Sequence, residues 1–207
     1  MVQIPEPAKE RLLHLMRILE KNGSGPVTSG QVEGLTGWSS CTIRKDISYL
    51  GGDCGGNAVG SSCGYNPASL IPAIKKALGL DRCRRFCVVG LGRLGSAYLN
   101  FRPVELEEFE LVAGFDINVN RVEIVKSPVP LYPAYKMANL IPRFFIEAAF
   151  LCVPEDAAQT AAEKLVSAGI RGILNFAPVV LTVPPEVAVR NVYVVDELRA
   201  LSIRLST

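Results

Sequence analysis

The sequence predicts an α/β protein in which a helix-turn-helix part precedes a doubly wound parallel sheet. Apolar residues recur at helical spacing up to about residue 80, apart from a Gly-rich segment at residues 51–64. From residue 86 onward, short apolar runs alternate with helix-compatible stretches, as in a parallel sheet with crossover helices. The 207 residues, 49% apolar and 20% charged, suffice for two small domains. We expect domains at 1–80 and 85–195, followed by a C-terminal helix at 196–207.

Three helices are expected before the Gly-rich segment. The first opens at Pro5 and ends near residue 21, with leucines at helical spacing on its buried face. The second covers residues 30–35 with Ser29 as its cap, and the third runs from Ser39 or Ser40 to Leu50. Because a tight turn separates these two short helices, the pattern is that of a helix-turn-helix.

The Gly-rich segment and the helix after it complete the first domain. Residues 51–64 contain six glycines and are interpreted as a hairpin or wing. Asn66 is expected to cap a further helix that reaches Leu78, with Pro67 at its first position. Residues 79–85 are the expected linker. Together with the helix-turn-helix, these elements predict a winged-helix domain.

The third helix presents a polar face opposite Ile43 and Ile47. Two adjacent cations among small hydroxyls suit phosphate anchoring and base contacts in the major groove of DNA. Residues 1–85 carry 11 basic and 7 acidic residues, whereas residues 86–207 carry 11 and 13, which favours a polyanionic partner for the first domain. A solvated helix face without a ligand is the alternative. The candidate DNA-binding residues are Ser40, Thr42, Arg44, Lys45, Ser48 and Tyr49.

The second half of the chain is predicted to alternate between strands and helices. In such open parallel sheets, ligands bind at the carboxyl ends of the strands. The expected strands are 86–89, 110–115, 129–131, 148–153, 172–175 and 190–195. The expected helices are 92–101, 133–141, 155–168 and 196–205.

A glycine fingerprint follows the first of these strands and opens a helix, as a dinucleotide-binding turn requires. Its first glycine makes the tight turn, its second admits a pyrophosphate, and its third lets the helix approach the strand. Asp116 ends the next strand and is expected to accept a hydrogen bond from an adenosine ribose hydroxyl. A tight turn without a ligand is the alternative. The candidate cofactor residues are Gly90, Leu91, Gly92, Arg93, Leu94, Gly95, Asp116, Val153 and Pro154.

Several other classes of function are disfavoured. The N-terminus lacks the apolar run of a signal peptide, and no apolar run approaches the length of a membrane span, so we expect a cytoplasmic protein. The six cysteines form no CxxC pair and His14 is the only histidine, so neither a metal site nor a catalytic acid–base pair is expected. Cofactor binding without such a pair favours a sensor over a dehydrogenase.

The sequence resembles the Rex family of redox-sensing transcriptional repressors over nearly its whole length. The resemblance rests on blocks in both halves of the chain: Ile43–Tyr49 (IRKDISY), Gly64–Tyr65, Val89–Gly95 (VGLGRLG), Val153–Pro154 with Ala157–Gln159, and Ala168–Pro178 (AGIRGILNFAP).

This resemblance implies a winged helix followed by a Rossmann domain, in a homodimer that exchanges its C-terminal helix. It implies repression of genes of fermentation and respiration through operator DNA when NADH is low, and release of DNA when NADH binds and closes the dimer. NAD(H) is then the cofactor, and the aromatic residue expected near the nicotinamide is Phe101, where the family often has tyrosine.

Two further positions depart from the family pattern. The segment 53–63 is longer than usual and lacks the basic residues of the family's wing. An arginine on the first helix pairs in the family with an aspartate on the last strand, and Arg17 matches that arginine. Tyr193 stands where the aspartate is expected, so the switch between the two DNA-binding states is predicted to be weakened.

Two alternatives stay open at this point. One is an NAD-dependent oxidoreductase with a helical appendage, which a turnover assay would reveal. The other is a DNA-binding protein whose Rossmann domain has weakened or lost its response to NADH, which a titration with NADH would reveal.

Overall fold

The computed structural model describes residues 4–21, 25–51, 64–100 and 108–205. The chain divides into two compact units, Met1–Arg82 and Cys83–Thr207. Two predicted features, most of the wing and Phe101, lie outside the described residues.

The first unit is helical, with a core formed mainly by leucine and isoleucine side chains such as Leu12, Leu19 and Ile47. The predicted caps Ser39 and Asn66 are confirmed. The second helix is capped one residue earlier than predicted, by Thr28 instead of Ser29, because Thr28 and Gln31 form a reciprocal capping box. The described helices are α1 (Glu6–Lys21), α2 (Ser29–Thr36), α3 (Ser40–Ser48) and α5 (Pro67–Leu78).

A short antiparallel bridge joins two distant segments of this unit. The amide of Val27 donates to the carbonyl of Tyr65 at 2.9 Å, and the amide of Tyr65 donates to the carbonyl of Val27 at 2.8 Å. The bridge holds together two segments of this unit, one of which, at Tyr65, follows the expected wing in the sequence.

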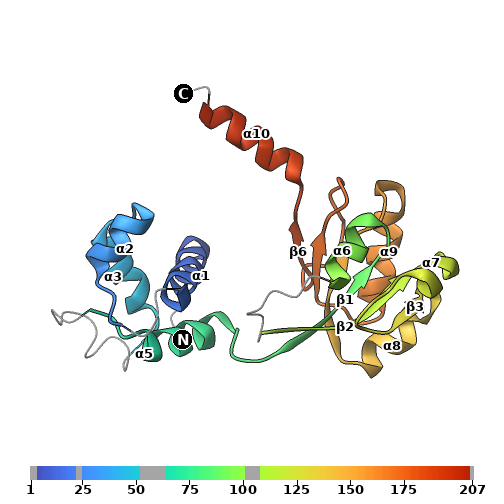
Figure 1. The fold of residues 1–207 in the computed structure, drawn as a ribbon, viewed down its shortest axis with the longest axis horizontal. Coiled ribbons are helices and arrows are strands. Elements are labelled where there is room, and N and C mark those ends of the chain that lie inside the picture. Colours follow the sequence, from blue (N-terminus) through green and yellow to red (C-terminus); the bar gives the residue numbers. More distant parts are fainter. Residues whose placement is uncertain (1–3, 22–24, 52–63, 101–107, 206–207) are drawn as a thin grey trace. The chain divides into compact units, whose positions relative to one another are not determined.

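The second unit contains the predicted doubly wound parallel sheet, with strand order β3-β2-β1-β4-β5-β6 (Figure 1). The order reverses between β1 and β4, which is where such folds bind ligands. The strands are β1 (Arg84–Val89), β2 (Phe109–Asp116), β3 (Leu131–Pro133), β4 (Ile146–Leu151), β5 (Gly172–Asn175) and β6 (Ala188–Asn191).

Helices cover both faces of the sheet. Residues of α8 and α9 pack with Cys87 and Val89 on one face. Residues of α6 and α7 pack with Val88 on the other face. The helical elements are α6 (Arg93–Asn100), α7 (Val119–Ile124), η1 (Ala134–Lys136), α8 (Met137–Arg143), α9 (Glu155–Ser167) and α10 (Val194–Leu205).

Some predicted boundaries are wrong. The last strand ends at Asn191 instead of residue 195, because α10 already begins at Val194. The short helix α7 was not predicted, since it has no buried residue to mark a helical period. No residue of α10 is buried, and its exposed apolar side chains include Leu198, Leu201 and Ile203.

Candidate functional site

The glycine fingerprint joins β1 to α6 through three different environments. A Cβ atom on Gly95 would lie 1.8 Å from the Gly90 carbonyl oxygen, and one on Gly90 would lie 2.4 Å from the Cys152 carbonyl oxygen. A Cβ atom on Gly92 would meet nothing within 4 Å. Gly90 and Gly95 are therefore needed for packing, whereas the space beside Gly92 is open to a ligand.

Asp116 ends β2 beneath this turn and is buried, with 3% exposure. Its Oδ2 accepts from the Leu91 amide at 2.6 Å, and its Oδ1 accepts from the Asn118 amide at 2.7 Å. Arg121 Nη1 lies 3.5 Å from Oδ2. The carboxylate is thus held in one orientation, with a cation that sequence reasoning missed beside it.

A cavity of about 760 Å³ lies over the carboxyl ends of the central strands. Of the predicted cofactor residues, those that line it are Gly90, Gly92, Arg93, Leu94, Asp116, Val153 and Pro154. Leu91 and Gly95 do not line it, because both are buried against the sheet. Arg121 and Lys164, which sequence reasoning missed, also line the cavity, as does Phe176 directly after β5.

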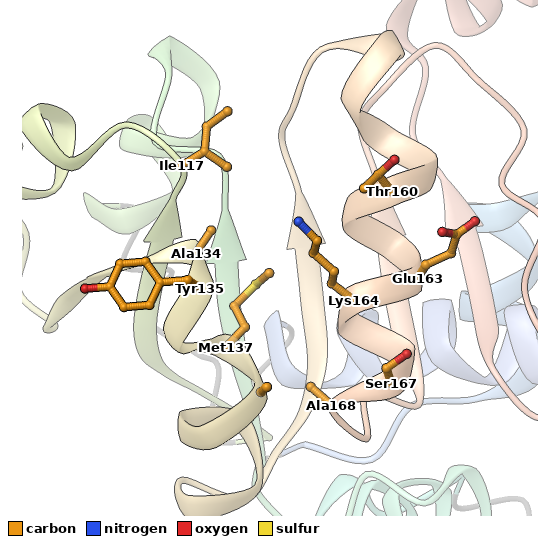
Figure 2. A pocket seen from close by; sticks show the side chains of 10 residues that line it. Ile117, Ala134, Tyr135, Met137, Thr160, Glu163, Lys164, Ser167 and Ala168 are labelled. Atoms are coloured by element: carbon orange, nitrogen blue, oxygen red, sulfur yellow. The ribbon is translucent and has the colours of Figure 1, made fainter.

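A second cavity of about 610 Å³ continues from the first between η1, α8 and α9. Figure 2 shows Lys164 extending from α9 toward Ile117 and Ala134, while Glu163 points to the other side of the helix. Glu163 Oε1 accepts from Gln159 Nε2 at 3.1 Å. Lys164 is therefore directed into the recess, and Glu163 is also among the residues that line it.

The other end of the first cavity is aromatic. The ring of Phe176 packs against Tyr98 of α6 at 4.8 Å and against Phe150 of β4 at 5.8 Å between ring centroids. Cys152 also lines this cavity, and burial raises the pKa of its thiol to about 12. At neutral pH it is a protonated thiol and a poor nucleophile.

On α3, the predicted DNA-binding residues have different surroundings. Arg44 and Lys45 are both exposed on α3. Tyr49 is half-buried against the helical core. The three hydroxyls have local partners: Ser40 donates to the Glu33 carboxylate, Thr42 pairs with Ser39 at 2.9 Å, and Ser48 donates to the Lys45 carbonyl at 2.6 Å.

A bidentate ion pair joins α3 to α1. Arg11 Nε donates to Asp46 Oδ2 at 2.6 Å, and Arg11 Nη2 donates to Oδ1 at 2.9 Å. Asp46 is only 4% exposed. In the sequence, the sign of this ion pair is an acidic residue next to Ile47, on the buried side of the helical repeat. Sequence reasoning did not use that sign.

The two predicted switch residues lie in different units, so their pairing stays a prediction. Arg17 is exposed on α1. The Tyr193 carbonyl accepts from the Asp196 amide at 3.0 Å at the start of α10. The Asp196 carboxylate accepts from Arg199 Nη1 at 2.9 Å.

The described residues also bear on other classes of site. They contain no group of three or more His, Cys, Asp or Glu side chains placed to hold a metal ion. Within the same ranges, no helix is both long enough and apolar enough to cross a membrane.

Comparisons with known proteins identify the family. Residues 81–179 match the family described as CoA binding domain. The chain is 41% identical to the redox-sensing transcriptional repressor Rex of Thermus thermophilus, over 97% of this chain and 93% of that protein. It is 34% identical to Rex of Ligilactobacillus salivarius, with the same coverage. The chain belongs to the Rex family.

Solved structures of RSP, a Rex-family repressor, agree with the fold over both units. The complex of RSP with β-NAD⁺ and operator DNA matches 99% of this chain and 94% of RSP, with 32% identity and a TM-score of 0.87. The complex with β-NADH covers 99% and 95%, with 32% identity and a TM-score of 0.83. The predicted fold class, a winged helix followed by a Rossmann sheet, is therefore confirmed.

Proposed function

We propose that this Rex-family protein is a homodimeric transcriptional repressor that senses the NADH/NAD⁺ ratio in the cytoplasm. It binds double-stranded operator DNA when NADH is low and releases it when NADH binds, without catalysing a reaction. The observation that carries the proposal is that a single chain combines two features. It has an exposed cationic helix α3 in a helix-turn-helix, and a cavity at the switch point of a Rossmann sheet.

The cavity supports a specific orientation of NAD(H). The pyrophosphate lies beside Gly92, where the backbone is open, and meets the amides at the start of α6. The adenosine ribose meets Asp116, and the adenine enters the recess beside Lys164. The nicotinamide extends past Val153 and Pro154 to Phe176. The exposed apolar residues of α10 support its role as the exchanged dimer helix.

The test is operator binding measured with and without NADH, beside a fluorescence titration of NADH. Release at rising NADH supports the proposal. NADH binding without release would favour a repressor with a lost response, and consumption of NADH with 2-oxo acids would favour an oxidoreductase.

The first prediction concerns cofactor choice. Asp116→Ala should weaken NADH binding about ten- to hundredfold, because a hydrogen bond to a charged group contributes about 1.5–3 kcal/mol. The wild type should prefer NADH to NADPH, since the carboxylate repels a 2′-phosphate. Arg121→Ala should increase the preference for NADH over NADPH. The variant lacks the cation 3.5 Å from the carboxylate, which would otherwise attract the 2′-phosphate. Calorimetric titration measures all three effects. Equal affinities of the wild type for NADH and NADPH would contradict the proposed orientation of the cofactor.

The second prediction concerns DNA. Arg44→Ala and Lys45→Ala should each weaken operator binding by about 1–3 kcal/mol, because both exposed cations face away from the core. Fluorescence anisotropy with labelled operator measures the loss. Lys76→Ala on α5, another exposed lysine, is the matched control. If Arg44→Ala and Lys45→Ala bind like the control, α3 is not the recognition helix.

The third prediction concerns the departure at Tyr193. Tyrosine carries no charge near neutral pH, and a neutral hydrogen bond contributes about half as much as a charged one. NADH should therefore bind the wild type but release DNA incompletely, since a ligand shifts an equilibrium only by its differential affinity for the two states. Tyr193→Asp should make release sharper in an anisotropy titration, whereas Tyr193→Phe should not. Full release by the wild type and no effect of Tyr193→Asp would show that the departure is silent.

A further inference from the structure

The segment after β5 forms one wall of the cavity. We call residues 176–183 the β5 loop. Phe176 lines the cavity and packs against Tyr98, on the helix that follows the glycine turn. A ligand that reaches this wall of the cavity therefore meets the first residue of the β5 loop.

Asn175 fastens the start of this loop to the neighbouring strand. Its side chain is fully buried, with 0% exposure. Its Oδ1 accepts from the Ala177 amide at 3.0 Å, and its Nδ2 donates to the Val179 carbonyl at 2.8 Å. The same Nδ2 donates to Asn191 Oδ1 at 2.9 Å. One carboxamide thus holds the β5 loop and β6 together, and such satisfied buried networks fix a single local geometry.

The contact between Asn175 and Asn191 lies at the end of a short edge strand. β6 is an edge strand of four residues, pairing only with β5 in the described sheet. Asn191 is exposed, and the ladder continues one step further, from the Val192 amide to the Asn175 carbonyl at 2.8 Å. Two residues later α10 begins. A shift of Asn175 therefore acts directly on the segment that leads into α10.

The far end of the β5 loop is fastened elsewhere. Gln159 of α9 donates through Nε2 to the Thr182 carbonyl at 2.8 Å, and its Oε1 accepts from the Thr182 amide at 3.0 Å. Since α9 holds that end, we expect a displacement of Phe176 to act on Asn175 at the near end.

We propose that Asn175 is a positioning residue for the NADH response: it transmits occupancy of the cavity through Asn191 to β6 and α10. The inference rests on the proposed function, because it assumes that NADH enters the cavity and that α10 joins the dimer. It adds a route by which binding beside Phe176 reaches the dimer helix.

The test removes the hydrogen bond between Asn175 and Asn191 by changing Asn191, the exposed partner. Asn191→Ala removes the acceptor on β6 while Asn175 Nδ2 keeps the Val179 carbonyl as a partner. We expect NADH affinity within threefold of the wild type by fluorescence titration, and unchanged operator binding without NADH. The NADH concentration for half-release of DNA should rise at least tenfold. Asn191→Asp retains an acceptor oxygen and should release DNA at nearly wild-type NADH.

Gln159→Ala is the matched control, because it loosens the same loop without touching β6. Its release midpoint should shift only as much as its NADH affinity. The inference alone would be overturned if Asn191→Ala released DNA at the same NADH concentration as the wild type. It would also be overturned if the release midpoint and the NADH affinity of this variant shifted equally. A wild type that neither binds NADH nor responds to it would overturn the proposed function as well.

Discussion

Gly92→Ala is expected to abolish NADH binding while leaving the second unit folded. A Cβ atom at this position meets nothing within 4 Å, so it can be added without strain in the protein. The same methyl group would occupy the space where the pyrophosphate approaches the backbone. We expect at least a hundredfold loss of NADH affinity by calorimetry, equivalent to about 2.7 kcal/mol, with an unchanged unfolding temperature.

Gly95→Ala is the contrasting variant, since its Cβ atom would lie 1.8 Å from a backbone oxygen that cannot move aside. Overpacking of this kind costs about 3 kcal/mol, so thermal unfolding of the second unit should occur at a clearly lower temperature. Wild-type NADH affinity in Gly92→Ala would show that the dinucleotide does not follow the fingerprint. Equal unfolding temperatures for the two variants would contradict the packing role of Gly95.

The parts of this structure that follow from the sequence are those set by local pattern. The strands β1 and β2 and the turn that joins β1 to α6 follow from apolar runs and three glycines, whose spacing has a steric meaning. The caps at Ser39 and Asn66 follow from side-chain hydrogen bonds that span only two or three residues. The helix α7 escapes this reasoning because it buries no residue.

The parts that sequence reasoning missed depend on residues far apart in the chain. Lys164 lines the cavity only because α9 packs opposite η1 and α8. Asn175 and Asn191 meet because two parallel strands pair in one register. The sequence does not distinguish Asp46 from other polar helix residues, because its partner Arg11 lies on a different helix, α1. Each needs the tertiary fold, which fixes contacts that no spacing along the chain encodes.

Asp46→Ala is expected to unfold the first unit at a lower temperature and to abolish operator binding. The substitution leaves Arg11 facing a buried site without its bidentate partner. Breaking a buried pair costs 3–5 kcal/mol. We expect about 3 kcal/mol, at the low end of that range, because the Arg11 side chain is 28% exposed and water can reach it.

Trp38, the only tryptophan of the chain, packs against the core of this unit, so its fluorescence follows the unfolding of that unit. NADH affinity, measured by calorimetry, should not change, because every described residue that lines the cofactor cavity belongs to the second unit. The double variant Arg11→Met with Asp46→Leu separates folding from orientation. Replacing a buried pair by apolar side chains is often neutral or stabilising, so this variant should regain its unfolding temperature. If the ion pair also sets the angle of α3, operator binding should stay weak in the refolded variant. Operator binding by Asp46→Ala at wild-type strength would contradict both roles, because α3 would then hold its position without Arg11.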